Sequence, residues 1–159
     1  MQRRAHTTQL DRNVIEDASQ KRIIGRWISH ADSCLEMGGG YGRTTSFIEP
    51  FFHKVAMADV SEGSLQLART VLRKTSLVQG DASSIPMKDS SFDFIFMVKV
   101  VHLLRDPALA MREIQRVSKD QGILMMTIPN LPMNSLIRSF EERVSPKLRH
   151  ILPTFGPAI

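Results

Sequence analysis

The sequence predicts an α/β fold whose sheet is doubly wound and mainly parallel, with helices on both faces. Short apolar segments of strand type alternate with segments of helical periodicity five times along the 159 residues. This alternation favours right-handed crossovers and parallel strands that are covered on both sides. Ligands of such sheets bind beyond the carboxyl ends of the strands, and polar or glycine-rich residues follow several of the expected strands directly.

The first half of the expected sheet contains two strands, each followed by a helix. A strand at residues 33–36 comes directly before a glycine-rich segment. The helix that follows covers 44–52 and is cut at or near Pro50, because proline has no N–H to donate inside a helix. Residues 55–60 (VAMADV) form the second strand, and Ser61 can cap the next helix. The apolar side of that helix carries Leu65, Ala68, Val71 and Leu72.

The second half contains three strands and one helix. Residues 77–79 form the third strand, and 92–100 (FDFIFMVKV) the fourth, because this run is too rich in aromatic and β-branched residues for a surface helix. Asp106 is a helix cap and Pro107 a first-turn proline. The fifth strand covers 122–128 (GILMMTI). The helix before it turns Ala110, Ile114 and Val117 inward.

Two further segments flank this core. An amphipathic helix is expected before the glycine-rich segment, and a second helix at 134–144 is followed by a proline-broken tail. We therefore expect an N-terminal helical segment over 1–32, a core over 33–130, and a C-terminal helix and tail over 131–159. The first helix carries Val14, Ala18, Ile24, Trp27 and Ile28 at near-helical spacing.

Composition limits the function classes. A content of 42% hydrophobic and 23% charged residues is ordinary for a soluble globular protein. The apolar runs fall short of the ~18 residues of a membrane span, and the polar start has no signal-peptide core, so we expect a cytoplasmic protein without a membrane partner. The single cysteine, Cys34, cannot form an internal disulfide, and no Cys/His cluster has metal-ligand spacing, so no metal is expected.

The net charge of +5 permits an acidic partner such as RNA. The excess positive charge is spread thinly along the chain and has no aromatic residues interleaved with it. Solvated faces explain this pattern better than a nucleic-acid groove. An RNA partner is therefore permitted but not favoured.

Residues 34–45 (CLEMGGGYGRTT) require a backbone without side chains at several positions. A nucleotide P-loop needs Gly-Lys before Ser or Thr, whereas Gly42 is followed by Arg43. A dinucleotide loop needs G-x-G-x-x-G, a spacing that these glycines do not have. The pattern that remains is acidic-x-Gly-x-Gly-x-Gly, formed by Glu36, Gly38, Gly40 and Gly42. A carboxylate would repel a pyrophosphate and favour a cationic ligand.

With several further segments, this motif resembles the class I S-adenosylmethionine-dependent methyltransferases, and within them the small-molecule methylating group. The resemblance runs from about Ser33 to Asn130 and includes LEMGGGYG, ADVS, GDASSIPMKDSSFDFIF, VVHLLRDP and EIQRVSKDQGILMMTIPN. Asp59 follows Gly38 by about 20 residues, the spacing of a ribose-binding acid. The resemblance implies a Rossmann-like methyltransferase core with S-adenosyl-L-methionine as cofactor, S-adenosyl-L-homocysteine as product and a small molecule as methyl acceptor.

The resemblance also implies a set of cofactor-binding residues. The glycine turn lets the main chain lie against the methionyl and ribose portions, and Glu36 favours the amino group directly or through water. Asp59 binds the ribose hydroxyls, and Asp81 accepts from the adenine amino group. The full set is Glu36, Met37, Gly38, Gly40, Gly42, Asp59, Val60, Asp81, Ala82 and Val98. Structural alternatives stay open: close packing for the glycines, a helix cap for Asp59 and a turn for Asp81.

Catalysis needs little covalent chemistry, because methyl transfer from a sulfonium is a direct displacement. The enzyme aligns the reacting atoms and excludes water. His102 is a candidate general base, although a histidine at the end of a buried strand is more often structural. Asp93, in the segment SSFDFIF, is expected to be structural rather than catalytic. Lys99 hints at an anionic acceptor or a salt bridge. The chain lacks the Asp/Asn-Pro-Pro-aromatic stretch of methylases of exocyclic base nitrogens, so that acceptor is disfavoured.

The C-terminal part departs from the family. Relatives add a sixth and a seventh strand, whereas residues 131–159 contain no convincing pair of strands, so the sheet is expected to lack both. The fifth strand would then be an exposed edge, through which a homo-oligomer could form. An alternative function follows: an S-adenosylmethionine-binding module without independent activity, completed by a partner or a second copy.

Overall fold

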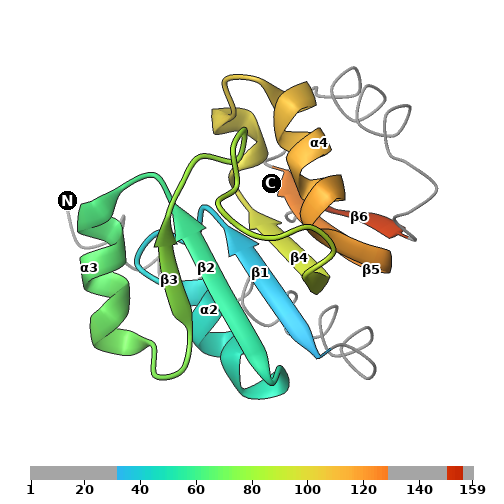
Figure 1. Cartoon of the computed structure of the whole chain (residues 1–159). Coiled ribbons are helices and arrows are strands. Elements are labelled where there is room, and N and C mark those ends of the chain that lie inside the picture. The colour runs from blue at the N-terminus through green and yellow to red at the C-terminus, as the bar shows by residue number, and fades with distance from the viewer. Residues whose placement is uncertain (1–31, 129–149, 156–159) are drawn as a thin grey trace. The chain divides into compact units, whose positions relative to one another are not determined.

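The computed structural model describes residues 32–128 and 150–155. The two helices expected over 1–32 and 134–144 lie outside these residues. Within them, the sequence folds into a six-stranded sheet with the order β3-β2-β1-β4-β5-β6 (Figure 1). All five neighbouring pairs are parallel. The strands are β1 (Ser33–Met37), β2 (Lys54–Asp59), β3 (Ser76–Gln79), β4 (Phe92–Val98), β5 (Ser118–Ile128) and β6 (His150–Phe155).

The strand order reverses between β1 and β4. The chain runs outward from β1 through β2 to β3 and then returns to β4, on the other side of β1. The loops that leave β1 and β4 therefore diverge at the carboxyl edge of the sheet. This is the place where open parallel sheets bind ligands.

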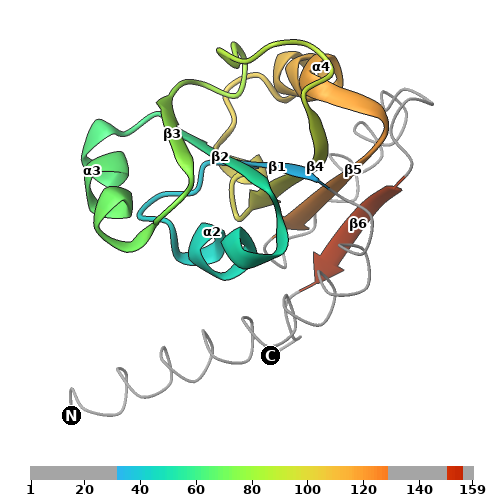
Figure 2. The same ribbon diagram turned by 60° about the horizontal axis from the view of Figure 1, so that its bottom comes forward.

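Helices lie on both faces of the sheet. Helix α2 (Arg43–Ile48), continued by the 3-10 turn η2 (Glu49–Phe51), lies on one face, and α4 (Pro107–Val117) on the other (Figure 2). Helix α3 (Glu62–Val71) packs its Leu65 and Ala68 against Met57 of β2. A second 3-10 turn, η3 (Val101–Leu103), follows β4. The predicted doubly wound α/β fold is confirmed.

The expected caps start two of the helices. The Ser61 hydroxyl accepts a hydrogen bond from Ser64 N at 3.2 Å, and Asp106 Oδ1 accepts one from Leu109 N at 2.9 Å. Both side chains satisfy N–H groups that have no partner inside the helix. Val71, expected on the buried side of α3, is 50% exposed. It is the last residue of the helix, beyond the stretch that Met57 covers, so the prediction for Val71 was wrong.

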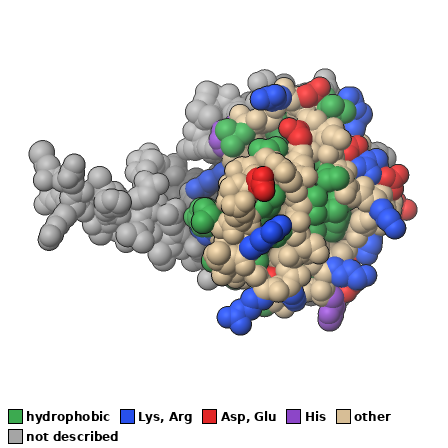
Figure 3. Space-filling model, turned by 60° about the vertical axis from the view of Figure 1, so that its left-hand side comes forward, with side chains coloured by type: hydrophobic (Ala, Val, Ile, Leu, Met, Phe, Trp, Pro, Cys, Tyr) green, Lys and Arg blue, Asp and Glu red, His purple; other side chains and the backbone are tan. Residues whose placement is uncertain are grey.

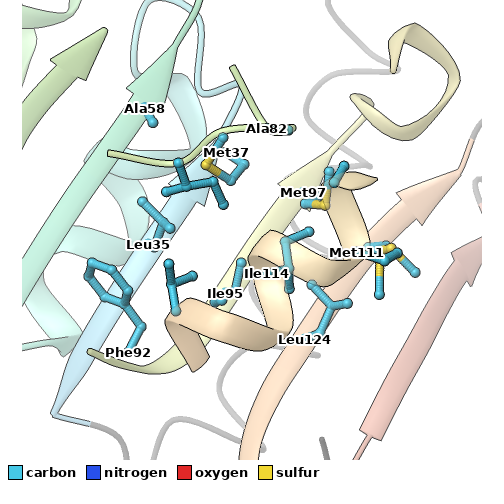
Figure 4. Close-up of a cluster of buried hydrophobic side chains, with 14 of the residues drawn as sticks. Leu35, Met37, Ala58, Ala82, Phe92, Ile95, Met97, Met111, Ile114 and Leu124 are labelled. Carbon is cyan, nitrogen blue, oxygen red and sulfur yellow. The ribbon is translucent and has the colours of Figure 1, made fainter. Parts of the chain in front are cut away.

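The core on the α4 face is built from alternate strand residues. Leu35 of β1 and Ile95 and Met97 of β4 point toward Met111 and Ile114 of α4 (Figure 4). Because strand side chains alternate between faces, their neighbours point the other way. On that opposite face lies an aromatic cluster of Phe52, Phe94 and Phe96.

The connection between β3 and β4 is a loop that α4 holds in place. Arg116 donates to Ile85 O and Met87 O, both at 2.8 Å, and pairs with Glu113 at 2.7 Å. Glu113 in turn accepts from Ile85 N at 2.8 Å. These contacts satisfy backbone groups of a non-helical segment, which would otherwise need water. They fix the loop that carries Asp81.

The fourth strand is shorter than expected. It ends at Val98, because Lys99 has a φ of +57°, in the left-handed region that a strand cannot contain. The prediction that this strand continues to Val100 was wrong. The bend turns the chain into η3 directly after the buried part of β4.

A sixth strand is present, against the expectation that the sheet lacks strands six and seven. β6 pairs with β5 in parallel from Ile123↔His150 to Ile128↔Phe155. Pro153 suggested a broken tail, but proline is tolerated in an edge strand, where one row of N–H groups needs no partner in the sheet. β5 is therefore paired on both sides, which removes the basis for a homo-oligomer through an exposed fifth strand. No seventh strand occurs among residues 32–128 and 150–155.

Candidate functional site

The loop after β1 contains three glycines in the left-handed region. Gly38, Gly40 and Gly42 have φ values of +71°, +56° and +86°. Residues with a Cβ adopt these values at a cost of roughly 1–2 kcal/mol each, so the alternating motif is required by the backbone. Gly38 N donates to Ala58 O at 2.7 Å, and Gly42 N to Gly39 O at 3.0 Å. The loop is thereby bent over the ends of β1 and β2.

The surroundings of these glycines differ. A Cβ on Gly38 would overlap the Val100 side chain, and one on Gly39 would overlap Met57. A Cβ on Gly40 would meet no atom within 4 Å. Close packing, the structural alternative, therefore accounts for Gly38 but not for Gly40. Gly40 has open space on the side where its Cβ would project, and a ligand can approach the backbone there.

Asp59 joins this loop to the next. It is the last residue of β2 and is 8% exposed. Its Oδ2 accepts from Gly40 N at 2.8 Å, and its Oδ1 accepts from Ser61 N at 2.9 Å. Ser61, not Asp59, is the cap of α3. Each carboxylate oxygen has a second lone pair, so Asp59 can still accept from two hydroxyls of a ligand.

The loops after β2 and β3 are also joined. Asp59 O accepts from Gly80 N at 3.1 Å, and Gln79 Nε2 donates to Val60 O at 3.1 Å. Val60 is 62% exposed, which is unusual for a large apolar side chain beside a buried strand. The structure thus brings an exposed apolar side chain close to the segment that contains Asp81.

Asp81 lies in a tight turn. Its Oδ1 accepts from Ser83 N at 2.7 Å, and Asp81 and Ser84 form an isolated bridge. The backbone N–H and hydroxyl of Ser83 hold the pKa of Asp81 below its usual value, and the charge of Arg105 acts in the same direction. Asp81 is therefore ionised at neutral pH, with one oxygen used by the turn. Ala82, next to it, is buried.

Glu36 lies under the glycine loop. It is 2% exposed, and its neighbours in register are Met57 and Phe96, both fully buried. Burial raises the pKa of Glu36 to about 7, while hydrogen bonds from Thr45 and Thr44 act in the opposite direction. Thr45 Oγ1 donates to Glu36 Oε2. Residue pattern alone did not identify Thr45 or Thr44; the run of hydroxyl residues after the glycines was the only signal.

The end of β4 lies beside the glycine loop. Val98 is buried, and Val100 packs against Gly38. Lys99 N donates to the buried hydroxyl of Thr127 at 2.8 Å, while the Lys99 side chain is exposed. Thr127 is a second residue that sequence reasoning missed. It holds the left-handed turn that ends β4 next to the glycine loop.

Two candidates stand apart from this arrangement. His102 is exposed on η3, and no hydrogen bond among the described residues joins it to the glycine loop, Asp59 or Asp81. Asp93 lies at the other end of β4, where it accepts from Ser33 Oγ at 2.7 Å and pairs with Lys119 at 2.8 Å. Asp93 is structural, as its position suggested.

The parallel sheet, the glycine loop after β1 and the carboxylate at the end of β2 define the class of protein: a Rossmann-like domain of the methyltransferase type. The chain belongs to the family described as "Methyltransferase domain", whose sequence model matches residues 35–126. S-adenosylmethionine is the cofactor of this family. The predicted resemblance is confirmed.

Individual relatives agree with this assignment. A ubiquinone/menaquinone biosynthesis C-methyltransferase, UbiE, of Shewanella frigidimarina is 31% identical over 137 residues, 79% of this chain and 52% of that protein. The chain thus spans about half the length of the curated relatives it matches. An S-adenosylmethionine-dependent methyltransferase of Thermotoga maritima has a TM-score of 0.63 at 23% identity, over 87% of this chain and 63% of the other.

A further solved structure is a complex between the Haloferax volcanii Trm112 methyltransferase activator and a methyltransferase-like protein. Its matching chain has a TM-score of 0.55 at 20% identity, over 66% of this chain and 54% of the other. At this identity the likeness shows the fold alone.

The residues present fit the cofactor. Gly40 offers an open backbone, Asp59 has acceptor capacity left for two hydroxyls, and Val60 presents an apolar surface of the kind a purine covers. Over the part of the chain that is described, no group of three His, Cys, Asp or Glu side chains could hold a metal ion. None of the described helices is both long and apolar enough to cross a membrane.

Proposed function

We propose that this chain is an S-adenosylmethionine-dependent methyltransferase that acts on a small-molecule acceptor. The observation that carries the proposal is the position of Asp59. Its carboxylate holds Gly40 N at 2.8 Å, beside the open side of that glycine, at the carboxyl edge of the sheet. A carboxylate with unused lone pairs at this place is suited to a ribose.

The other residues take roles that follow from their positions. Asp59 binds the ribose hydroxyls, and Val60 packs on the adenine. Asp81 accepts from the adenine amino group with the oxygen that its turn leaves unused, and the Ala82 N–H donates to the ring. The main chain from Met37 to Gly42 lies along the methionyl portion, and Val98 lies near the reacting methyl.

When bound, S-adenosylmethionine supplies a methyl group on a sulfonium and leaves as S-adenosylhomocysteine. The residues of the chain bind, align and exclude water. His102, exposed on the turn after β4, takes a proton from the acceptor where the acceptor must lose one. Lys99, exposed at the same edge, favours an acceptor that carries a negative charge.

For the acceptor, we propose an aromatic ring methylated at carbon. The support is the family of the relatives, of which UbiE of Shewanella frigidimarina is named a C-methyltransferase of ubiquinone and menaquinone biosynthesis. An ionised phenol ring is electron-rich at carbon and negatively charged, which suits Lys99. We also propose a cytoplasmic location, where the free, buried thiol of Cys34 stays reduced.

A second candidate function is a cofactor-binding module that needs a partner or a second copy to be active. The observation that favours it is a neighbour of the same fold that was solved in complex with a partner, the Trm112 methyltransferase activator of Haloferax volcanii.

Turnover separates the two. Purified chain is incubated with S-adenosylmethionine and a hydroquinone or naphthohydroquinone, and S-adenosylhomocysteine is measured together with the mass of the protein in solution. We expect product from the chain alone. Cofactor binding without product from any of these acceptors, restored by a second protein, would favour the module instead. Absence of cofactor binding would overturn both.

A further inference from the structure

The carboxyl group of Glu36 lies beneath the glycine loop, and the residue is only 2% exposed. It points from β1 into the space between the sheet and α2, flanked by the buried side chains of Met57 and Phe96. The open side of the loop lies at Gly40, whose backbone contacts Asp59. Glu36 can therefore act on cofactor binding through the residues that it contacts.

Thr45 lies between this carboxyl group and the glycine loop. It is fully buried in α2, and its Oγ1 donates to Glu36 Oε2. The same Oγ1 lies 3.3 Å from the point that a Cβ on Gly39 would occupy. Thr44 Oγ and Thr45 N–H also hydrogen-bond to the carboxyl group. The Thr45 hydroxyl therefore hydrogen-bonds to the buried acid and lies beside Gly39 of the loop.

Glu36 also stands in for a missing helix cap. The residue at the N-cap of α2 is Gly42, which has no side chain to accept from the first turn. The first N–H groups of a helix need acceptors, and a buried one without a partner is costly. Here the acceptor comes from β1, through the backbone and side chains of the first turn.

We propose that Thr45 is a positioning residue for cofactor binding, through which Glu36 holds the glycine loop in the conformation that the cofactor needs. The inference rests on the proposed function, because it concerns the same site. The loop is then held at two points. Asp59 binds Gly40 from the ligand side, and Glu36 with Thr45 supports Gly39 and the start of α2 from below.

The ionisation of Glu36 gives a second way to test its role in cofactor binding. Because burial raises the pKa of Glu36 to about 7, part of the population carries a proton there at neutral pH. The ionised form accepts the Thr45 hydroxyl more strongly, and it attracts a cationic ligand. Among the described residues the ionisable group that acts on Glu36 is Arg43 of α2, whose charge lowers the pKa of Glu36. Glu36 in turn raises the pKa of the neighbouring Cys34 thiol. The facing residues of β2 and β4, Met57 and Phe96, are apolar.

The experiment measures the Kd of S-adenosylmethionine by calorimetry for the full chain and three variants. T45V removes the hydroxyl at constant shape, and T45S keeps it. T75V is the matched control, because Thr75 Oγ1 donates at 2.7 Å to Glu49, which is another buried glutamate. Glu49 also accepts from Arg73 N and Lys74 N before β3. We expect T45V to raise the Kd about tenfold, and T45S and T75V to leave it within about twofold.

Proton release gives a test without substitution. The wild-type chain is titrated with cofactor at pH 7 in buffers of different ionisation enthalpy, and we expect proton release that E36Q abolishes. The inference is overturned if T45V binds S-adenosylmethionine as tightly as the wild type. It is also overturned if T75V loses as much affinity as T45V. Both results leave the proposed function standing. If T45V does not fold, the absence of proton release in the wild type overturns it. A wild-type chain that binds no cofactor overturns both.

Discussion

Gly40 N donates to Asp59 Oδ2 at 2.8 Å, so the loop after β1 and the end of β2 are held together by one side chain. The same carboxylate accepts from Ser61 N at 2.9 Å. Asp59 therefore orders two loops at the carboxyl edge, and its remaining lone pairs can still accept hydrogen bonds from a ligand.

Asp59→Ala should weaken binding of S-adenosylmethionine by about 1–3 kcal/mol, because charge-assisted hydrogen bonds to the ligand are lost. Calorimetric titration measures the change. Asp89→Ala is the control, since Asp89 is an exposed carboxylate paired with Arg116, away from the loop. An unchanged Kd in the Asp59 variant would count against a ribose role.

Gly38→Ala and Gly40→Ala should separate folding from binding. A methyl on Gly38 overlaps Val100, so the variant should lose about 2–3 kcal/mol of unfolding free energy. A methyl on Gly40 meets open space, so the variant should lose only about 1 kcal/mol of unfolding free energy through backbone strain. The same methyl narrows the space that the cofactor would occupy, so binding should weaken. Urea unfolding and cofactor titration measure both quantities.

Gly63→Ala is the matched control for these two variants. Gly63 lies in α3 with only Ser61 Oγ near its Cβ position, so alanine should stabilise the helix by about 0.5–1 kcal/mol without affecting the Kd. If Gly40→Ala binds the cofactor as tightly as the Gly63 variant, the cofactor does not approach the backbone at Gly40.

Glu36 should make stability depend on pH. Burial raises its pKa from 4.5 to about 7, so the folded state binds a proton that the unfolded chain releases. The resulting stabilisation is complete below about pH 4.5 and is lost as the pH rises through 7, with a total of about 3 kcal/mol. The Glu36→Gln variant should lack this pH-dependent contribution to the unfolding free energy.

The measurement is the difference in unfolding free energy between wild type and Glu36→Gln, without cofactor, from pH 5 to pH 8. The difference isolates Glu36, because Asp81, Asp93, Glu49 and Glu113 have pKa values lowered from their usual ones and titrate below this range. A difference that stays constant with pH would show that the carboxyl group does not titrate near neutrality.

His102→Ala should leave the cofactor Kd unchanged, because His102 lies on η3 without a hydrogen bond to the loop or to Asp59 among the described residues. If His102 is the general base, kcat with a phenolic acceptor should fall about 10²-fold. Leu103→Ala, at the adjacent exposed position, is the control. Equal kcat in the two variants would assign His102 a surface role.

The sequence predicted those features that local chemistry determines. Glycines at alternating positions predicted a turn whose backbone carries no side chains there, and Gly38, Gly40 and Gly42 form this turn with positive φ values. The caps at Ser61 and Asp106 and the inward residues of α4 followed from side-chain chemistry and helical spacing. Each of these depends on neighbours within a few positions in the chain, which a sequence displays directly.

Features that depend on distant neighbours were not predictable. The expected interaction of Glu36 with the amino group of the cofactor, directly or through water, stays a prediction. The hydrogen bond that Glu36 accepts from Thr45 was not predictable, because it depends on the packing of α2 against β1. The bend at Lys99 depends on the Thr127 hydroxyl of β5, 28 positions away. β6 was missed because Pro153 breaks a local pattern that an edge strand tolerates.

The most direct test of the account is a calorimetric titration of the purified chain with S-adenosylmethionine, and separately with a nicotinamide dinucleotide. We predict saturable binding of one S-adenosylmethionine, weakened in Asp59→Ala, and no comparable binding of the dinucleotide. No heat of binding from S-adenosylmethionine at saturating concentration, or tighter binding of the phosphate-bearing ligand, would contradict it.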